Sequence, residues 1–93
     1  MANNLIVTYD LSRPGQNYDD LIEAIKGLGS WAKINQSVWY VDSALSSTQA
    51  FDQLKGLCDS NDKLFVVDAT NDWCNWKGLS ERVSDHLKQH WNT

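Results

Sequence analysis

Two acidic residues that end short β-like runs are the first candidates for chemistry in this chain. Asp10 follows the apolar run 5–9, and Asp42 follows the run 37–41. A carboxylate at the end of a strand is an oxygen ligand suited to a hard cation such as Mg²⁺ or Mn²⁺. We therefore take Asp10 as the candidate catalytic acid, and Asp10 with Asp42 as candidate metal ligands.

Both acids also have purely structural interpretations. Asp10 precedes the turn-forming residues 12–15 and, as Asp commonly does, is able to bond to their backbone amides. Asp42 precedes Ser43 and suits a turn or capping position. These interpretations stay open beside the metal site.

A second spacing that suits metal ligands lies near the C-terminus. His86 and His90 are four residues apart, which sets two imidazoles on one helix face, with Glu81 and Asp85 nearby. A zinc protease motif needs Glu directly after the first His, and Leu87 stands there instead. Solvent-facing helix residues are the favoured interpretation of the pair.

Composition narrows the classes of function. Eight basic and twelve acidic residues give a net charge of -4, which disfavours nonspecific binding to nucleic acid. The two cysteines lack CxxC spacing, so neither a disulfide framework nor a four-cysteine zinc site is indicated. With no long apolar stretch and no basic start before an apolar run, we expect a cytoplasmic protein without membrane association.

The elements that must position these residues follow from hydrophobic periodicity and capping signals. We expect strands at 5–9, 31–34, 37–41 and 64–67. The first helix is expected to begin after an N-cap at Asn17, and the second after Ser46, which has capping-box spacing to Gln49. Buried stripes are expected to be Leu21, Ile22, Ile25 and Leu28 in the first helix, and Phe51, Leu54, Leu57 and Cys58 in the second.

This order of elements predicts an α+β fold of the ferredoxin-like type, βαββαβ, with a four-stranded antiparallel or mixed sheet and helices on one face. Residues 1–77 form that domain. Residues 78–93 are expected to add a C-terminal helix, packed on the same domain or on a dimer partner. We expect the first and third strands to be parallel neighbours, so that Asp10 and Asp42 emerge at one edge and Asp68 at the other.

The chain resembles the CRISPR-associated Cas proteins of family two, small adaptation-complex proteins and endoribonucleases, and especially their stand-alone SinR-like relatives. The matching stretches are 5–10, 31–41 and 60–67, in the right order and spacing. The resemblance implies a homodimer in which the first-strand acid, Asp10, faces its copy and holds a divalent metal. In members that are nucleases, such a metal activates water to hydrolyse a phosphodiester in RNA or DNA.

By the same resemblance, Tyr9, Ser12 and Arg13 beside Asp10 are expected to contact the substrate. This chain departs from the family in its acidic charge, because Arg13 is the one basic residue in the loop after Asp10. Few cations are then available to hold a polyanion near the acid.

The tryptophans are expected to pack in the core or at a dimer interface, with Trp31, Trp39 and Trp91 as the interface candidates. Stacking on nucleic-acid bases is the alternative role for them. Two functions follow for the whole chain: a homodimeric metal-dependent phosphodiesterase, or a non-enzymatic acidic dimer that scaffolds or inhibits a nucleic-acid-binding protein.

Overall fold

The computed structural model describes residues 2–12 and 18–93. Arg13 and the predicted N-cap Asn17 lie outside the described residues. Across the described ranges, no helix has the length and apolar character needed to cross a membrane. The elements, in chain order, are β1 (Asn3–Asp10), α1 (Asp19–Lys26), β2 (Ser30–Asn35), β3 (Val38–Ser43), α2 (Ser47–Lys55), β4 (Lys63–Asp68) and α3 (Glu81–His90).

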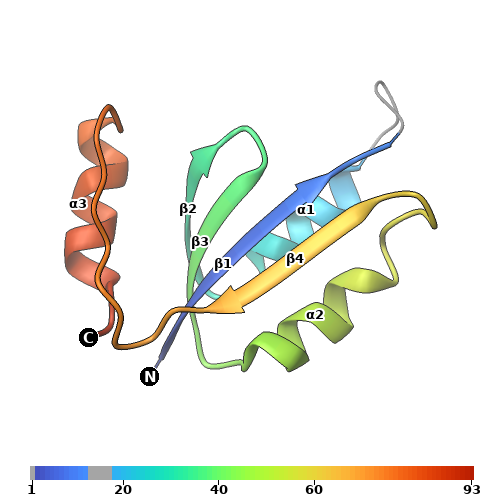
Figure 1. The fold of residues 1–93 in the computed structure, drawn as a ribbon, viewed down its shortest axis with the longest axis horizontal. Coiled ribbons are helices and arrows are strands. Elements are labelled where there is room, and N and C mark those ends of the chain that lie inside the picture. The colour runs from blue at the N-terminus through green and yellow to red at the C-terminus, as the bar shows by residue number, and fades with distance from the viewer. Residues whose placement is uncertain (1, 13–17) are drawn as a thin grey trace.

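The four strands form one sheet in the order β2-β3-β1-β4, with every neighbouring pair antiparallel. Figure 1 shows β1 in the middle of this sheet, and α3 standing apart from α1 and α2. The βαββαβ order and this strand order confirm the predicted ferredoxin-like type of α+β fold.

The expected parallel pairing of the first and third strands is wrong. Helix α1 carries the chain from β1 to β2, and the tight β2–β3 hairpin then reverses it, so β3 enters between them antiparallel to β1. In this register Asn4 lies opposite Asp42, whereas Asp10 lies opposite Lys63 of β4. Asp10 and Asp42 therefore lie at opposite ends of the sheet.

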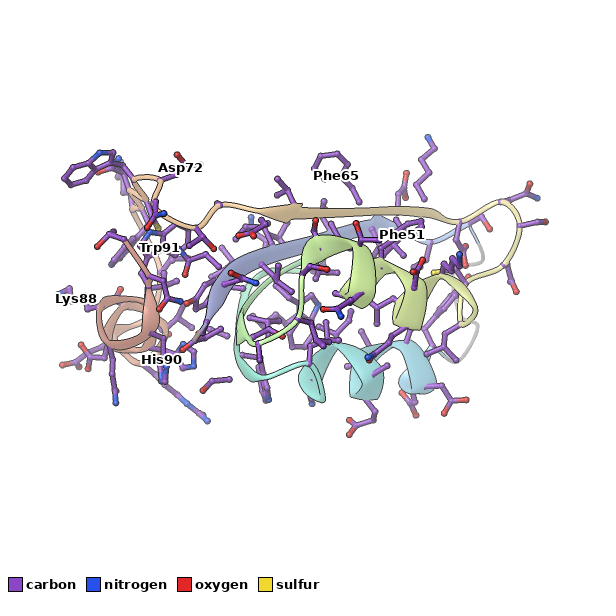
Figure 2. The ribbon with its side chains drawn as sticks, turned by 90° about the horizontal axis from the view of Figure 1, so that it is seen from below. Phe51, Phe65, Asp72, Lys88, His90 and Trp91 are labelled. Carbon is purple, nitrogen blue, oxygen red and sulfur yellow. The ribbon has the colours of Figure 1, made fainter. Side chains whose placement is uncertain are left out.

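The helix-covered face of the sheet carries the core. Side chains alternate between the two faces of a strand, so one set of alternate residues in β1 and β3 meets α1 and α2. Figure 2 shows both of these helices on the same side of the strands. The buried members of this core are Leu5, Val7, Tyr9, Leu21, Ile25, Leu28, Trp39, Val41, Ala50 and Leu54.

Helix α2 begins as predicted, and it buries Leu54 of the predicted stripe but not Phe51, while Leu57 and Cys58 follow its last residue, Lys55. The Ser46 hydroxyl accepts a hydrogen bond from the Gln49 amide, and the Gln49 side chain accepts one from the Ser46 amide, which completes the capping box. Ala50 and Leu54 are fully buried, whereas Phe51 is 38% exposed and Leu57 is 40% exposed. The predicted stripe is too wide because α2 packs near the edge strand β4, where the sheet covers only a narrow part of the helix.

The C-terminal segment covers part of the second face of the sheet. The Tyr40 side chain lies on this face, and its ring meets those of Trp91 and His86 with centroids 5.4 and 5.9 Å away. Leu87, at 3% exposure, is the buried residue of α3. The helix therefore packs on the face opposite α1 and α2, beside β2 and β3.

A buried amide fastens this segment to the start of β1. The Asn4 side chain is fully buried, and its Nδ2 donates to the carbonyl oxygens of Asn92 at 2.6 Å and Ala69 at 3.3 Å. Its Oδ1 accepts from the backbone amide of Asn92 at 2.8 Å. A buried amide with all its partners supplied rigidifies a fold, but it becomes costly when those partners are lost.

Replacing Asn4 with Ala is expected to lower the free energy of unfolding by about 2–4 kcal/mol, because backbone groups of residues 69 and 92 would lose their buried partners. Urea unfolding followed by tryptophan fluorescence measures the change. The exposed Asn75 is the matched control, and Asn75→Ala is expected to change stability by no more than about 0.5 kcal/mol. Equal effects of the two substitutions would contradict a structural role for the Asn4 amide.

Candidate functional site

Asp10 lies exposed where β1 ends. Its register partner on the neighbouring strand is Lys63, which carries the opposite charge. A shallow cavity of about 340 Å³ adjoins it, lined by Thr8, Tyr9, Asp10, Lys63, Leu64 and Phe65. The acid is thus accessible to solvent and to a second molecule.

The residues expected to contact substrate beside Asp10 have other partners. The Tyr9 ring is buried in the core, and its hydroxyl accepts a hydrogen bond from Trp39 Nε1 at 3.0 Å. The backbone amide and hydroxyl of Ser12 both donate to Asp62 Oδ1, at 2.8 and 2.9 Å. The third expected residue, Arg13, lies outside the described residues. Tyr9 and Ser12 therefore take part in hydrogen bonds that hold the fold around Asp10, and their expected contact with a substrate stays a prediction.

Asp62 is the anchor of this region. Beyond its bonds to Ser12, its carboxylate accepts from the Tyr18 hydroxyl at 3.0 Å and from the Asp59 amide at 2.7 Å. The Ser12 amide, followed by the other donors, holds the pKa of Asp62 below its usual range, against a smaller opposing effect of desolvation. This carboxylate is ionised and structural, and it joins the chain after β1 to the loop before β4.

Asp42 belongs to a separate cluster at the other end of the sheet. Its Oδ2 lies 3.0 Å from His90 Nδ1, and its Oδ1 accepts from Asn92 Nδ2 at 3.1 Å. Because the antiparallel register separates Asp42 from Asp10, the predicted two-acid metal site does not form within one chain. Asp42 instead helps to hold the C-terminal segment.

The two histidines of α3 stack on each other instead of pointing separately into solvent. Their ring centroids are 4.3 Å apart, and His86 Nε2 lies 3.4 Å from Ser30 Oγ. Burial lowers the pKa of His86, and the neighbouring His90 acts in the same direction, while Asp42 opposes them. His86 is therefore neutral at physiological pH, packed between the sheet and His90.

This cluster does not assemble a known catalytic arrangement. Ser30 meets His86, while Asp42 meets His90, so no single imidazole links a hydroxyl to a carboxylate as a serine hydrolase requires. Within residues 2–12 and 18–93, no group of three or more His, Cys, Asp or Glu side chains is arranged to hold a metal ion. The cluster is best described as a polar junction between α3 and the sheet.

The three tryptophans proposed for an interface have different surroundings. Trp39 is 2% exposed and belongs to the core, because its position in β3 directs it toward α1 and α2. Trp91 is half-buried within the chain, where its Nε1 donates to the Asp72 carbonyl oxygen at 2.8 Å. Trp31 is 37% exposed, with Lys26 Nζ 4.9 Å from its ring centroid. Of the three, Trp31 is the most exposed.

The exposed apolar surface of the sheet lies elsewhere, on β4. Phe65 is 62% exposed and Val67 is 39% exposed, and both lie on the second face, beyond the part that the C-terminal segment covers. Figure 2 shows Phe65 on the side of β4 opposite Phe51 and α2. Sequence reasoning missed this surface because a continuous apolar run also suits a fully buried strand.

Comparisons with known proteins return no match for this chain. A scan of protein-family models finds none that fits. Neither the curated proteins nor the solved structures contain a significant match. The resemblance to the Cas proteins of family two therefore stands on the sequence stretches given above, and its functional implications remain proposals.

The lowered pKa of His86 predicts a loss of stability in acid. The ordinary pKa of a histidine, 6.5, applies to His86 in the unfolded chain, whereas its pKa in the folded chain is lower. As pH falls, the unfolded chain therefore takes up a proton at His86 before the folded chain does, and the free energy of unfolding decreases. Urea unfolding between about pH 7.5 and about pH 5.5 should show a steeper loss for the native chain than for His86→Gln.

Proton NMR titration of the two imidazoles provides an independent measurement. The His86 ring is expected to titrate below its ordinary value of 6.5. The proposed burial effect would be refuted by two results together. His86 titrates at or above that value, and the free energy of unfolding changes with pH equally for the native chain and for His86→Gln.

Proposed function

We propose that this chain is a homodimeric interaction module of the cytoplasm that dimerises through the uncovered part of the sheet. We call this surface the outer face and define it by Thr8, Asp10, Lys63, Phe65 and Val67. The observation that carries the proposal is the Phe65 side chain, 62% exposed in the middle of the β4 strand. Burying apolar area of this kind stabilises association by about 25 cal/mol per Å² before the costs of binding are subtracted.

A second copy of the chain is the occupant that the charges favour. In a two-fold dimer each copy uses the same surface, so that surface must be complementary to itself. The outer face has Asp10 and Lys63 side by side at one end of its apolar centre. Rotated by the two-fold axis, the acid of one copy is able to meet the lysine of the other while the two Phe65 rings pack together.

A non-enzymatic role agrees with the electrostatics of such a dimer. Two copies with a net charge of -4 each carry -8, which repels nucleic acid and favours protein partners with basic surfaces. The described residues of one chain supply no cluster of metal ligands around Asp10. The module would then act as a scaffold or as an inhibitor of a nucleic-acid-binding protein.

The second candidate function is metal-dependent phosphodiester hydrolysis. The accessible Asp10 carboxylate, on the same outer face, supports it, because a two-fold axis close to Asp10 would bring both copies of the acid together. Two carboxylates would then hold Mg²⁺ or Mn²⁺, which activates water to attack the phosphorus of RNA or DNA. The two functions differ in what Asp10 faces across the dimer: Lys63 in the module, or Asp10 in the enzyme.

Replacing Phe65 with Ser is expected to convert the dimer to a monomer, because the apolar centre of the interface is lost. Size-exclusion chromatography with light scattering measures the mass of both forms. Leu57→Ser is the matched control, since Leu57 is 40% exposed but follows α2 and does not belong to the outer face. A native chain that runs as a monomer at about 100 μM would defeat the dimer proposal.

Asp10→Asn decides between the two functions. If the protein is an enzyme, the native chain with Mn²⁺ cleaves a mixed RNA and DNA substrate set, and Asp10→Asn lowers that rate by at least about a hundredfold. Asp85→Asn, which changes an exposed acid on α3, is the control and should leave any rate unchanged. The interaction module instead predicts no cleavage by any variant, so cleavage that depends on Asp10 would reject it.

A further inference from the structure

A deep groove runs between the edge strand β2 and helix α3. Its volume is about 650 Å³, within the range of cavities that bind ligands. Figure 1 shows α3 standing beside β2, on the side of the sheet away from β4. Its lining residues are Gly29, Ser30, Trp31, Ala32, Lys33, Ser80, Arg82, Val83 and His86.

The lining pattern shows what the strand presents to the groove. Successive side chains of a strand point to opposite faces, so a cavity on one face is lined by alternate residues. Here the consecutive residues 29–33 all line the groove. The groove therefore runs along the free backbone edge of β2, which has β3 as its neighbour on the other side.

The opposite wall comes from one face of α3. His86 follows Val83 by three residues and Arg82 by four, and this spacing sets His86 on the same side of the helix as both. A free strand edge facing a helix is the geometry in which an extended peptide joins a sheet as an added strand. The strand edge offers backbone hydrogen bonds, and the helix offers side chains that select the sequence.

The charge of the lining indicates the chemistry of the peptide. Lys33 and Arg82 are both exposed, and the described lining contains no acidic residue, although acids outnumber bases in the chain as a whole. Lys26, above the Trp31 ring, adds a further cation near the same strand. Lys33 Nζ lies 5.4 Å from the ring centroid of Trp39 and so belongs to the helix-covered face, whereas Arg82 lies on α3 at the other face. The two cations therefore lie on either side of the β2 edge, and they favour a ligand strand with carboxylates on both of its faces.

We propose that the β2–α3 groove binds an extended, acidic peptide of a partner protein as an additional antiparallel or parallel strand on β2. The site is independent of the proposed dimer, because β2 and β4 are the two opposite edges of the sheet. Backbone pairing distinguishes this ligand from a nucleic acid, which has no strand edge to offer to β2.

The probe for this proposal is an acetylated hexapeptide with Glu at its two central positions and Val elsewhere, which presents one carboxylate on each face of a strand. It is added at up to about 1 mM to the ¹⁵N-labelled full chain. We expect amide resonances of residues 29–33 and 80–86 to shift, with smaller changes on the outer face. The same peptide with N-methyl groups on alternate amides cannot pair with a strand edge, and we expect it not to bind.

Charge-reversing variants test the selectivity of the groove. Lys33→Glu and Arg82→Glu are each expected to weaken binding by at least about tenfold, whereas Lys88→Glu, outside the groove on the same helix, should keep the native affinity. Three results would each overturn the proposal. The amide resonances of residues 29–33 do not shift, the N-methylated peptide binds as well as the unmodified one, or a single-stranded oligonucleotide causes larger shifts than the peptide. Circular dichroism of the variants distinguishes lost binding from lost folding.

Discussion

The hydrogen bonds of the buried Asn4 amide hold together the parts of the molecule that form the two proposed binding surfaces. This side chain at the start of β1 binds backbone groups of Ala69 and Asn92, residues far away in the chain. The contacts fix both ends of the segment that contains α3, and the helix is thereby placed against the second face of the sheet. Because α3 covers β2 and β3 but not β4, one groove and one exposed apolar face result.

These two surfaces lie at opposite edges of the sheet and differ in character. The outer face around Phe65 is apolar, with an acid and a base side by side at one end, which suits association with a second copy. The groove beside β2 carries cations and a free backbone edge, which suits an acidic strand. Under the two proposals, the domain would form a dimer and display one peptide-binding groove on each copy.

The antiparallel pairing of β1 with β3 is the main constraint on catalysis. It carries Asp42 to the end of the sheet opposite Asp10 and leaves it bonded to His90 and Asn92. A pair of carboxylates that includes Asp10 would therefore need a second subunit to supply the other acid. The proposed interaction module makes no such demand on the dimer.

Local sequence signals determined the elements of this protein. Short apolar runs predicted all four strands, and Ser46 with Gln49 predicted the start of α2, because these features depend on neighbouring residues alone. The helix expected within residues 78–93 is likewise present as α3, where Leu87 is buried. The tertiary structure decided the direction of β3 relative to β1, the exposure of Phe65 and the groove between β2 and α3. Each of these depends on which distant segments pack together, and an apolar run or a charged residue has the same local pattern whether a neighbouring element covers it or not.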